Sequence, residues 1–228
     1  MKNNKVRIQK ILSNQQRLSR RKAEQAIRDK QVKVNGEFAH LGQLADPDID
    51  DIWVDPSILN KPKTTIAFYK PRGIVTNCPQ SGQTCIRDIL PPHLTHLSSI
   101  GRLDKESEGL IILTDDGLLA NHYLNAGVDH IRVYDVWLNK PLSESSRNRL
   151  QRGIPLLGGR TKPMTIEPIS TTVSRWTLTE GKNRQIRRMA MDVGCYVTRL
   201  KRIQFGPILL DNLKSGKYRD ITEYLQIK

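Results

Sequence analysis

The first sixty residues carry two short stretches in which apolar side chains have helical spacing. Ile8, Ile11 and Leu12 fall at positions i, i+3 and i+4, so they share one face of a helix. Residues 23–27 repeat this spacing, and Ser19 precedes them as a candidate N-cap. The pattern predicts two helices, each with one apolar face.

A strand pattern follows the second helix. Residues 32–34 alternate between apolar and polar and lead into Asn35-Gly36, a dipeptide typical of a type I′ hairpin turn. The Asp-Pro-Asp sequence at 46–48 indicates another turn, and residues 52–54 are expected to form a closing strand. The segment 57–64 has proline and lysine but no apolar periodicity, and we expect it to be a linker.

Beyond residue 64 the pattern changes to strands and helices separated by turn signals. We predict strands at 66–69, 110–114, 131–138 and 173–179, and helices at 118–125 and 184–194. Gly194 suits the residue just after the end of the last helix. Because strands and helices do not alternate regularly, the expected class is α+β with a largely antiparallel sheet flanked by helices.

The distribution of charge along the chain indicates an anionic binding partner. The chain has 228 residues, of which 37% are hydrophobic and 26% charged, and its formal net charge is +14. Residues 1–35 have a net charge of +9, residues 36–60 of −6, and residues 180–202 of +5. Two separate basic stretches favour nucleic-acid binding over a solvated basic helix, and they favour it more strongly than an anionic membrane surface.

Several classes of chemistry are excluded by their missing motifs. The chain has no P-loop, no dinucleotide-binding glycine pattern, no HExxH and no CxxC. His93 and His96 are three residues apart but lack a third ligand, so we expect no metal. The three cysteines form no recognisable framework, and the N-terminus has no apolar signal segment. Reduced thiols in a cytoplasmic protein are the expectation.

Two motifs remain as carriers of chemistry. GRLDKESEGLIILTDDG (101–117) places Asp104 at the entry to a buried strand, where an aspartate can act as nucleophile or base, although a turn or cap role is commoner. EGKNRQIRRM (180–189) places several arginines on a short helix, which could also bind phosphate without a catalytic role.

Both halves of the chain resemble known families. The run SRRKAEQAIRDKQVKVNG (19–36) resembles the S4 (α-L) RNA-binding domain, and the two motifs above, together with YKPRG (69–73), resemble the ribosomal RNA pseudouridine synthases. LNAGVDH (124–130) and GIPLLGGRTK (153–162) look most like the F subgroup of the large-subunit enzymes. The resemblance implies an S4 domain at 1–60 and a catalytic domain at 61–228.

The resemblance also implies roles for individual residues. Asp104 is the implied catalytic carboxylate, Arg187 its ion-pair partner, and Tyr134 the aromatic ring that stacks on a flipped uracil. Arg132 stands where the family has lysine, two residues before that tyrosine. The residues implied to contact RNA are Arg102, Arg184, Arg188, Arg20, Arg21, Lys22 and Arg132.

The function so implied is isomerisation of uridine to pseudouridine in ribosomal RNA, most closely a stem-loop of the large subunit. No cofactor is expected, because the reaction has no net redox change. We expect a monomer with no membrane partner. The alternatives are an enzyme for small-subunit RNA, a non-catalytic S4-type RNA-binding protein, and a glycosidase, which would need a pair of carboxylates such as Asp104 with Glu106 or Glu108.

Overall fold

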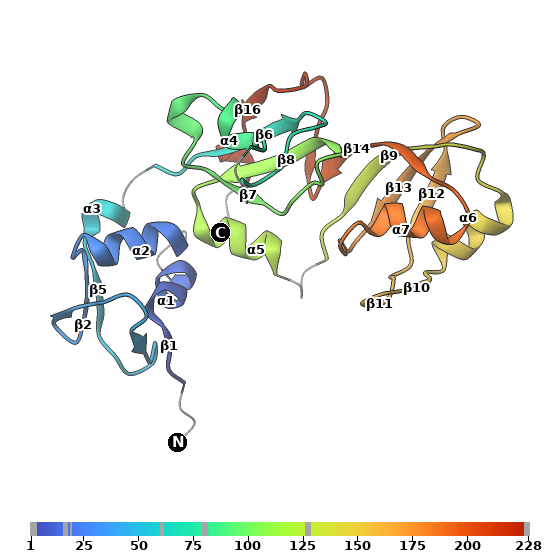
Figure 1. Ribbon diagram of the computed structural model, residues 1–228. Coiled ribbons are helices and arrows are strands. Elements are labelled where there is room, and N and C mark those ends of the chain that lie inside the picture. Colours follow the sequence, from blue (N-terminus) through green and yellow to red (C-terminus); the bar gives the residue numbers. More distant parts are fainter. Residues whose placement is uncertain are drawn as a thin grey trace.

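The computed structural model divides visibly into a small N-terminal unit and a larger unit built on a long sheet (Figure 1). It describes residues 4–15, 18, 20–59, 62–78, 82–125 and 129–225. Ser19, the predicted N-cap, and the side chain of Arg21 lie outside the described part. No helix within these ranges is long and apolar enough to cross a membrane.

The small unit contains the two predicted helices and a set of short strands. Its elements are β1 (Val6–Arg7), α1 (Ile8–Gln15), α2 (Arg20–Arg28), β2 (Val32–Val34), β3 (Glu37–Phe38), β4 (Leu44–Ala45), β5 (Ile52–Val54) and α3 (Pro56–Leu59). β1 pairs with β4, and β2 lies between β3 and β5, with all pairs antiparallel. The predicted hairpin and closing strand are therefore confirmed.

The apolar faces of the two helices meet the sheet in one core. The apolar residues of 8–12 and 23–27 are buried together with Val32, Val34 and Val54. Asn35 and Gly36 have φ values of 52° and 85°, which the type I′ turn requires and which few other residues adopt without strain. The small unit thus has an apolar core of its own.

The larger unit is an α+β fold around one sheet. Its elements are β6 (Thr65–Lys70), α4 (Ile86–Ile89), η1 (Pro92–Leu94), β7 (Ser98–Ile100), β8 (Glu108–Thr114), α5 (Gly117–Leu124), β9 (Arg132–Leu138), α6 (Glu144–Gln151), β10 (Pro155–Leu156), β11 (Gly159–Arg160), β12 (Thr165–Pro168), β13 (Val173–Leu178), α7 (Gln185–Asp192), β14 (Val197–Phe205), β15 (Ile208–Leu209), β16 (Tyr218–Asp220) and η2 (Thr222–Leu225). The sheet runs in the order β12-β13-β9-β14-β8-β6-β16. Only the β14–β8 pair is parallel among the described strands, as the predicted largely antiparallel sheet requires.

Helices cover both faces of this sheet. Alternate side chains of β8 separate the faces: Leu110 and Ile112 pack with α5, whereas Ile111 and Leu113 pack with α4. α7 packs against β9, β13 and β14 around the fully buried Trp176. Figure 1 shows α5 and α7 beneath the sheet, separated along its length.

Three features differ from the sequence-based expectations. The expected linker begins as the helix α3, and α6 with the β10–β11 hairpin was not predicted as secondary structure. The expectation of three reduced thiols is wrong for Cys78 and Cys85, which form a disulfide with 5.3 Å between their Cα atoms. Val75 forms an isolated parallel β-bridge with Cys85. Cys195 is free and buried.

An ion pair joins the two units. Lys22 Nζ of α2 lies 2.7 Å from the carboxylate of Asp115, which is 6% exposed. The other oxygen of Asp115 accepts a hydrogen bond from Thr64 N–H at 2.8 Å. Burial acts to raise the pKa of Asp115, but the bonds from Lys22 and Thr64 outweigh it, so the pKa lies below its usual range. Asp115 therefore links both units to the segment between them.

We predict that Asp115→Ala lowers the free energy of unfolding by about 1–3 kcal/mol at neutral pH, because a buried acceptor of two hydrogen bonds is lost. The folded pKa is depressed, so this contribution is present above the unfolded pKa near 4 and disappears as the pH falls through the folded value. Urea unfolding at neutral and acidic pH measures both effects. Asp29→Ala, which removes an exposed acid just after α2, serves as control. Equal losses for the two variants, or a loss that grows in acid, would contradict the assignment.

Candidate active site

A cleft of about 540 Å³ opens between α5 and α7, with β9 and β14 as its floor. Both motifs singled out in the sequence contribute to its walls. Residues 101–104 line one side, and residues 179–187 line the other. Leu103 and Ile186 supply apolar surface, as expected. The sequence-distant motifs are thus brought together at one site.

Asp104 lies in this cleft at the start of a tight turn. Its backbone carbonyl accepts a hydrogen bond from Ser107 N–H at 3.0 Å, and its side chain is about one-third exposed. The carboxylate lies 3.8 Å from the guanidinium of Arg184. A carboxylate in a concave site beside a cation has the chemistry of a nucleophile or a base.

Arg184 has an unusual backbone conformation. It precedes the first residue of α7 with φ 48° and ψ 32°, the left-handed region that non-glycine residues rarely adopt. Lys182 O accepts a hydrogen bond from Gln185 N–H, which closes the turn before the helix. Strained backbone of this kind is concentrated at functional sites, and here it directs a guanidinium toward Asp104.

The expected ion pair between Asp104 and Arg187 is not present: among the described residues it is Arg184 that pairs with the carboxylate. Arg187 donates instead to the carbonyls of Val197 and Glu106 and to the hydroxyl of Ser107. Those acceptors hold its guanidinium away from the carboxylate. Burial and the charge of Arg184 lower the pKa of Arg187, whereas Asp104 raises it, so the carboxylate still influences this arginine electrostatically.

Hydrogen bonds from the YKPRG segment and from Thr76, three residues after it, hold the turn that carries Asp104. Thr76 Oγ1 donates to Leu103 O at 2.7 Å and accepts from Leu103 N–H at 3.0 Å. Gly73 N–H donates to Lys105 O at 2.8 Å. Lys70 is fully buried and donates to the carbonyls of Pro71 and Ile74, and this burial lowers its pKa to about 8. These contacts fix the backbone on both sides of the carboxylate.

The remaining sequence-predicted residues of the catalytic unit are distributed around the cleft. Tyr134 and Arg132, on β9, line its floor, and the exposed Arg102 lines its mouth. Arg132 Nη1 donates to the carbonyls of His130 and Thr179. Arg188 does not line the cleft, because it donates to Leu157 O in the β10–β11 hairpin.

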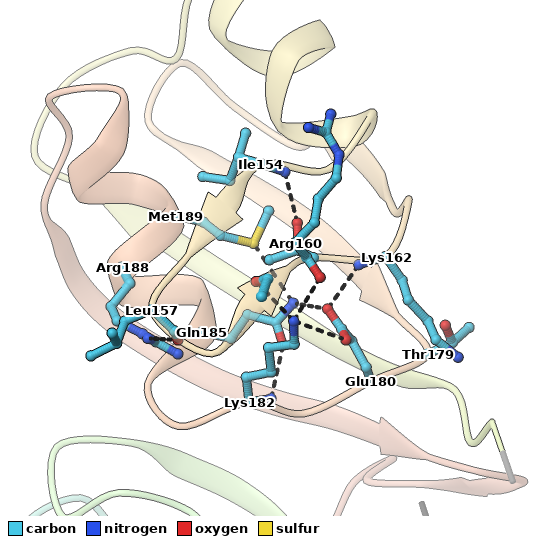
Figure 2. Close-up of polar contacts among 12 residues, drawn as sticks. Ile154, Leu157, Arg160, Lys162, Thr179, Glu180, Lys182, Gln185, Arg188 and Met189 are labelled. Atoms are coloured by element: carbon cyan, nitrogen blue, oxygen red, sulfur yellow. Dashed lines mark hydrogen bonds and ion pairs between the residues drawn. The ribbon is translucent and has the colours of Figure 1, made fainter. Parts of the chain in front are cut away.

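Polar contacts attach that hairpin to the start of α7 (Figure 2). Lys182 Nζ donates to the carbonyls of Gly159 and Arg160, while Glu180 accepts from Gln185 Nε2 and from Lys162 N–H. The hairpin therefore forms a fixed extension of the cleft wall.

The three basic residues at the start of α2 have different surroundings. Arg20 is exposed. Lys22 is half-buried in its ion pair with Asp115, and the side chain of Arg21 lies outside the described part. Lys22 thus contacts the second unit, which sequence spacing alone could not indicate.

Sequence reasoning missed several residues of the site. Thr76, Ser107 and Arg202 have no individual signal, since a threonine, serine or arginine at a strand or turn position has many uses. Pairing of distant strands and turns brings each of them to the cleft region.

A metal site receives no support from the described side chains of the cleft. Among the described residues the trio close enough to share an ion is Cys78, Cys85 and Asp88, and its two sulfurs are joined in the disulfide.

Comparison with known proteins identifies the class of this site. Residues 64–191 match the RNA pseudouridylate synthase family, and residues 6–42 match the S4 domain. The chain is 36% identical over 222 residues to the dual-specificity RNA pseudouridine synthase RluF of Escherichia coli K12, covering 96% of this chain and 76% of that protein. It is 33% identical to the ribosomal large subunit pseudouridine synthase B of Pseudomonas aeruginosa, covering 95% of this chain and 60% of that protein.

A solved structure agrees with these matches. The crystal structure of a pseudouridylate synthase superposes with a TM-score of 0.72 and 29% identity, covering 96% of this chain and 97% of that one. The chain therefore belongs to the RNA pseudouridylate synthase family, with an S4 domain at its N-terminal end, and its enzyme class is that of an isomerase.

We predict that Thr76→Val lowers kcat by about tenfold, since each lost hydrogen bond to the Leu103 backbone is worth about 1 kcal/mol and a carboxylate displaced by a fraction of an ångström reacts slowly. RNA affinity should stay unchanged, because Thr76 does not line the cleft. Single-turnover rates and RNA binding measure the two effects separately. Thr76→Ser, which keeps the hydroxyl, should restore the rate. A loss of affinity with unchanged kcat would refute the positioning role.

Proposed function

We propose that this enzyme converts a uridine of large-subunit ribosomal RNA to pseudouridine, with Asp104 as the catalytic carboxylate. The observation that carries the proposal is the cleft in which Asp104 meets Arg184 beside an aromatic floor. The family supplies the reaction, and the name of the Pseudomonas relative supplies the class of RNA.

The reaction exchanges one glycosidic bond for another. The N1–C1′ bond breaks, and its electron pair stays with the uracil. Asp104 either adds to C1′ or removes a proton from C2′, and both routes need it ionised. The uracil then turns and C5 bonds to C1′. On the first route the Asp104–C1′ bond breaks at this step, and on the second the proton held by Asp104 returns to C2′, so the carboxylate is regenerated either way. The proton at C5 is then lost, and N1 gains a proton. Atoms and electrons balance within the nucleotide, so no cofactor is required.

The cations around Asp104 have separate tasks in this mechanism. Arg184 forms an ion pair with the carboxylate at 3.8 Å. Arg187 holds the turn at Glu106 and Ser107, and so positions the carboxylate. Arg102, exposed at the mouth, is suited to take the space that the target nucleotide leaves in the RNA when it flips. Tyr134 offers its ring to the flipped uracil, a contact worth about 1–3 kcal/mol.

RNA binding by both units suits a substrate that presents a duplex beside an exposed nucleotide. The net charge of +14 attracts the phosphate backbone, and residues 1–35 hold +9 of it. We propose that Arg20 and Arg21 grip a helix of a stem-loop, while Arg132, Arg184 and Arg188 act near the cleft. Lys22 contributes by holding the S4 domain against Asp115.

Three further points complete the proposal. The S4 domain spans 1–60 and the catalytic domain 61–228, a division consistent with the separate apolar core of the first unit. We propose that the enzyme acts as a monomer. Its place of action is the cytoplasm, where a ribosomal RNA substrate would be available.

The rival functions fit the cleft less well. A glycosidase needs a second carboxylate near Asp104, yet Glu106 pairs with Arg72, and Glu108 accepts from Tyr69 and Arg199. Neither glutamate lines the cleft. A protein that only binds RNA has no use for a carboxylate among the arginines. The chain offers no specific observation in favour of small-subunit RNA.

We predict that Asp104→Asn abolishes pseudouridine formation, because the amide is neither a nucleophile nor a base. Fold and RNA affinity should stay close to those of the wild type, since Asp104 is partly exposed and makes one ion pair. Chemical detection of pseudouridine in a ribosomal RNA transcript gives the activity. Glu106→Gln, an exposed neighbour outside the cleft, is the matched control. Activity of Asp104→Asn within about tenfold of the wild type would reject the assignment.

The substrate is tested by offering the purified enzyme both ribosomal RNAs and mapping every new pseudouridine. We expect modification in a stem-loop of the large-subunit RNA, where bases can be splayed out. Modification confined to small-subunit RNA would contradict the substrate proposal but leave the reaction intact. Release of free uracil would instead support the glycosidase.

A further inference from the structure

A buried guanidinium on the floor of the cleft has no task in the mechanism above. Arg202 lies within β14 and is 3% exposed, yet it is one of the residues that line the cleft. Its Nε donates to Leu110 O at 2.7 Å, whereas its Nη2 is buried and has no hydrogen-bond partner among the described residues. Because a guanidinium stays protonated, burying one with an unused donor is costly unless a ligand completes it.

A second guanidinium, that of Arg132, lies at the same aromatic ring as Arg202. The guanidinium carbons of Arg202 and Arg132 lie 5.0 Å and 5.2 Å from the ring centroid of Phe205. Burial lowers the pKa of Arg132, and the charge of Arg202 lowers it further. In the described part of the chain, Arg202 has no carboxylate within ion-pair distance. Two carboxylates that line the cleft pair with other cations, Asp104 with Arg184 and Asp129 with Lys162. The floor therefore attracts an electron-rich group.

Strand pairing fixes the backbone of Arg202 beside Tyr134, the ring proposed to stack on uracil. Arg202 is the cross-strand partner of Tyr134 on β9 and of Gly109 on β8. A Cβ at Gly109 would lie 2.2 Å from Arg202 O, so β8 and β14 approach closely because that residue is glycine. With Leu110 O binding Nε, the guanidinium is fixed before substrate arrives, which is the arrangement that stabilises developing charge best.

We propose that Arg202, assisted by Arg132, binds a carbonyl oxygen of the flipped uracil and stabilises the negative charge on that base once the N1–C1′ bond breaks. This inference rests on the proposed pseudouridine formation. The electron pair left on N1 is shared with O2 and O4, and a donor to either oxygen therefore binds the detached base more strongly than the attached one. Such a donor both accelerates cleavage and retains the uracil while it turns.

The depth of Arg202 in the cleft favours uracil over phosphate as the group that it binds. A backbone phosphate is bulky and hydrated, and it stays at the mouth of a cleft with the rest of the RNA strand. A flipped base is the part of the substrate that enters the interior. Arg202 is almost completely buried next to Tyr134, whereas Arg102 and Arg184 are exposed. A base carbonyl is thus the acceptor that reaches Arg202.

Substrates with single-atom changes test this contact in the unaltered protein. Stem-loop RNAs are prepared with uridine, 2-thiouridine or 4-thiouridine at the mapped position, because sulfur accepts hydrogen bonds poorly. We expect one of the two thio-substituted RNAs to react at least about tenfold more slowly than the uridine RNA with wild-type enzyme, as loss of a hydrogen bond to a charged donor predicts. Equal single-turnover rates on all three would overturn the proposal.

The same substrates are then used with Arg202→Met and Arg202→Lys. Arg202→Met should lower kcat by about 100-fold, as removal of an oxyanion donor does, and should no longer distinguish the sensitive thio-RNA from the uridine RNA. Arg202→Lys should retain part of both properties. The matched control is Lys201→Met, which removes the neighbouring cation on β14. Lys201 lies over the ring of Tyr69 and does not line the cleft, so this variant should react as the wild type does.

Two other results would overturn the assignment. One is an unchanged thio effect in Arg202→Met, which would leave Arg202 with a structural role at Leu110 O. The other is a loss of affinity in Arg202→Met that is as large for an RNA with an abasic site at the target position as for the uridine RNA. Such a loss would indicate a contact with phosphate. Absence of any pseudouridine from wild-type enzyme on uridine RNA would instead reject the proposed function, so the two failures are distinguishable.

Discussion

The active site depends on keeping several guanidinium groups close together around a single carboxylate. Like charges at this distance repel, and burial makes each one costlier. The fold meets this constraint with backbone carbonyls: Val197 and Glu106 bind Arg187, while Leu110 binds Arg202. These neutral acceptors orient the cations without neutralising them. The positive field therefore remains available to a substrate, which is itself an anion.

The rest of the catalytic unit can be understood as support for that arrangement. β8 and β14 pair in parallel with a glycine at their contact, which brings Leu110 O to Arg202. Thr76 holds the backbone before Asp104, and the hairpin held by Lys182 extends the opposite wall. The S4 domain is attached through Asp115, at the end of the same strand that begins behind the catalytic turn. The strand β8 thus connects the turn that carries Asp104 with the residue that holds the S4 domain.

Local patterns predicted much of this structure, because helix faces, the Asn35-Gly36 turn and the apolar strands are determined by nearby residues. Asp104 and Tyr134, to which the motif resemblance pointed, both line one cleft. Side-chain partners were not predictable. Arg184 takes the place expected for Arg187. Arg184 itself has a left-handed backbone conformation just before α7, and its side chain pairs with Asp104. The disulfide and the role of Arg202 depend on contacts between segments far apart in sequence, which no local pattern encodes.

We propose that a uridine leaves its RNA helix and enters this cleft with its ribose at Asp104 and its base on the floor. A crystal structure of Asp104→Asn bound to an RNA stem-loop from the mapped site tests it most directly. We expect an extruded uridine, with uracil against Tyr134 and one carbonyl oxygen within hydrogen-bond distance of Arg202. A structure in which the uridine stays stacked in the RNA, with the RNA bound on another face, would contradict it.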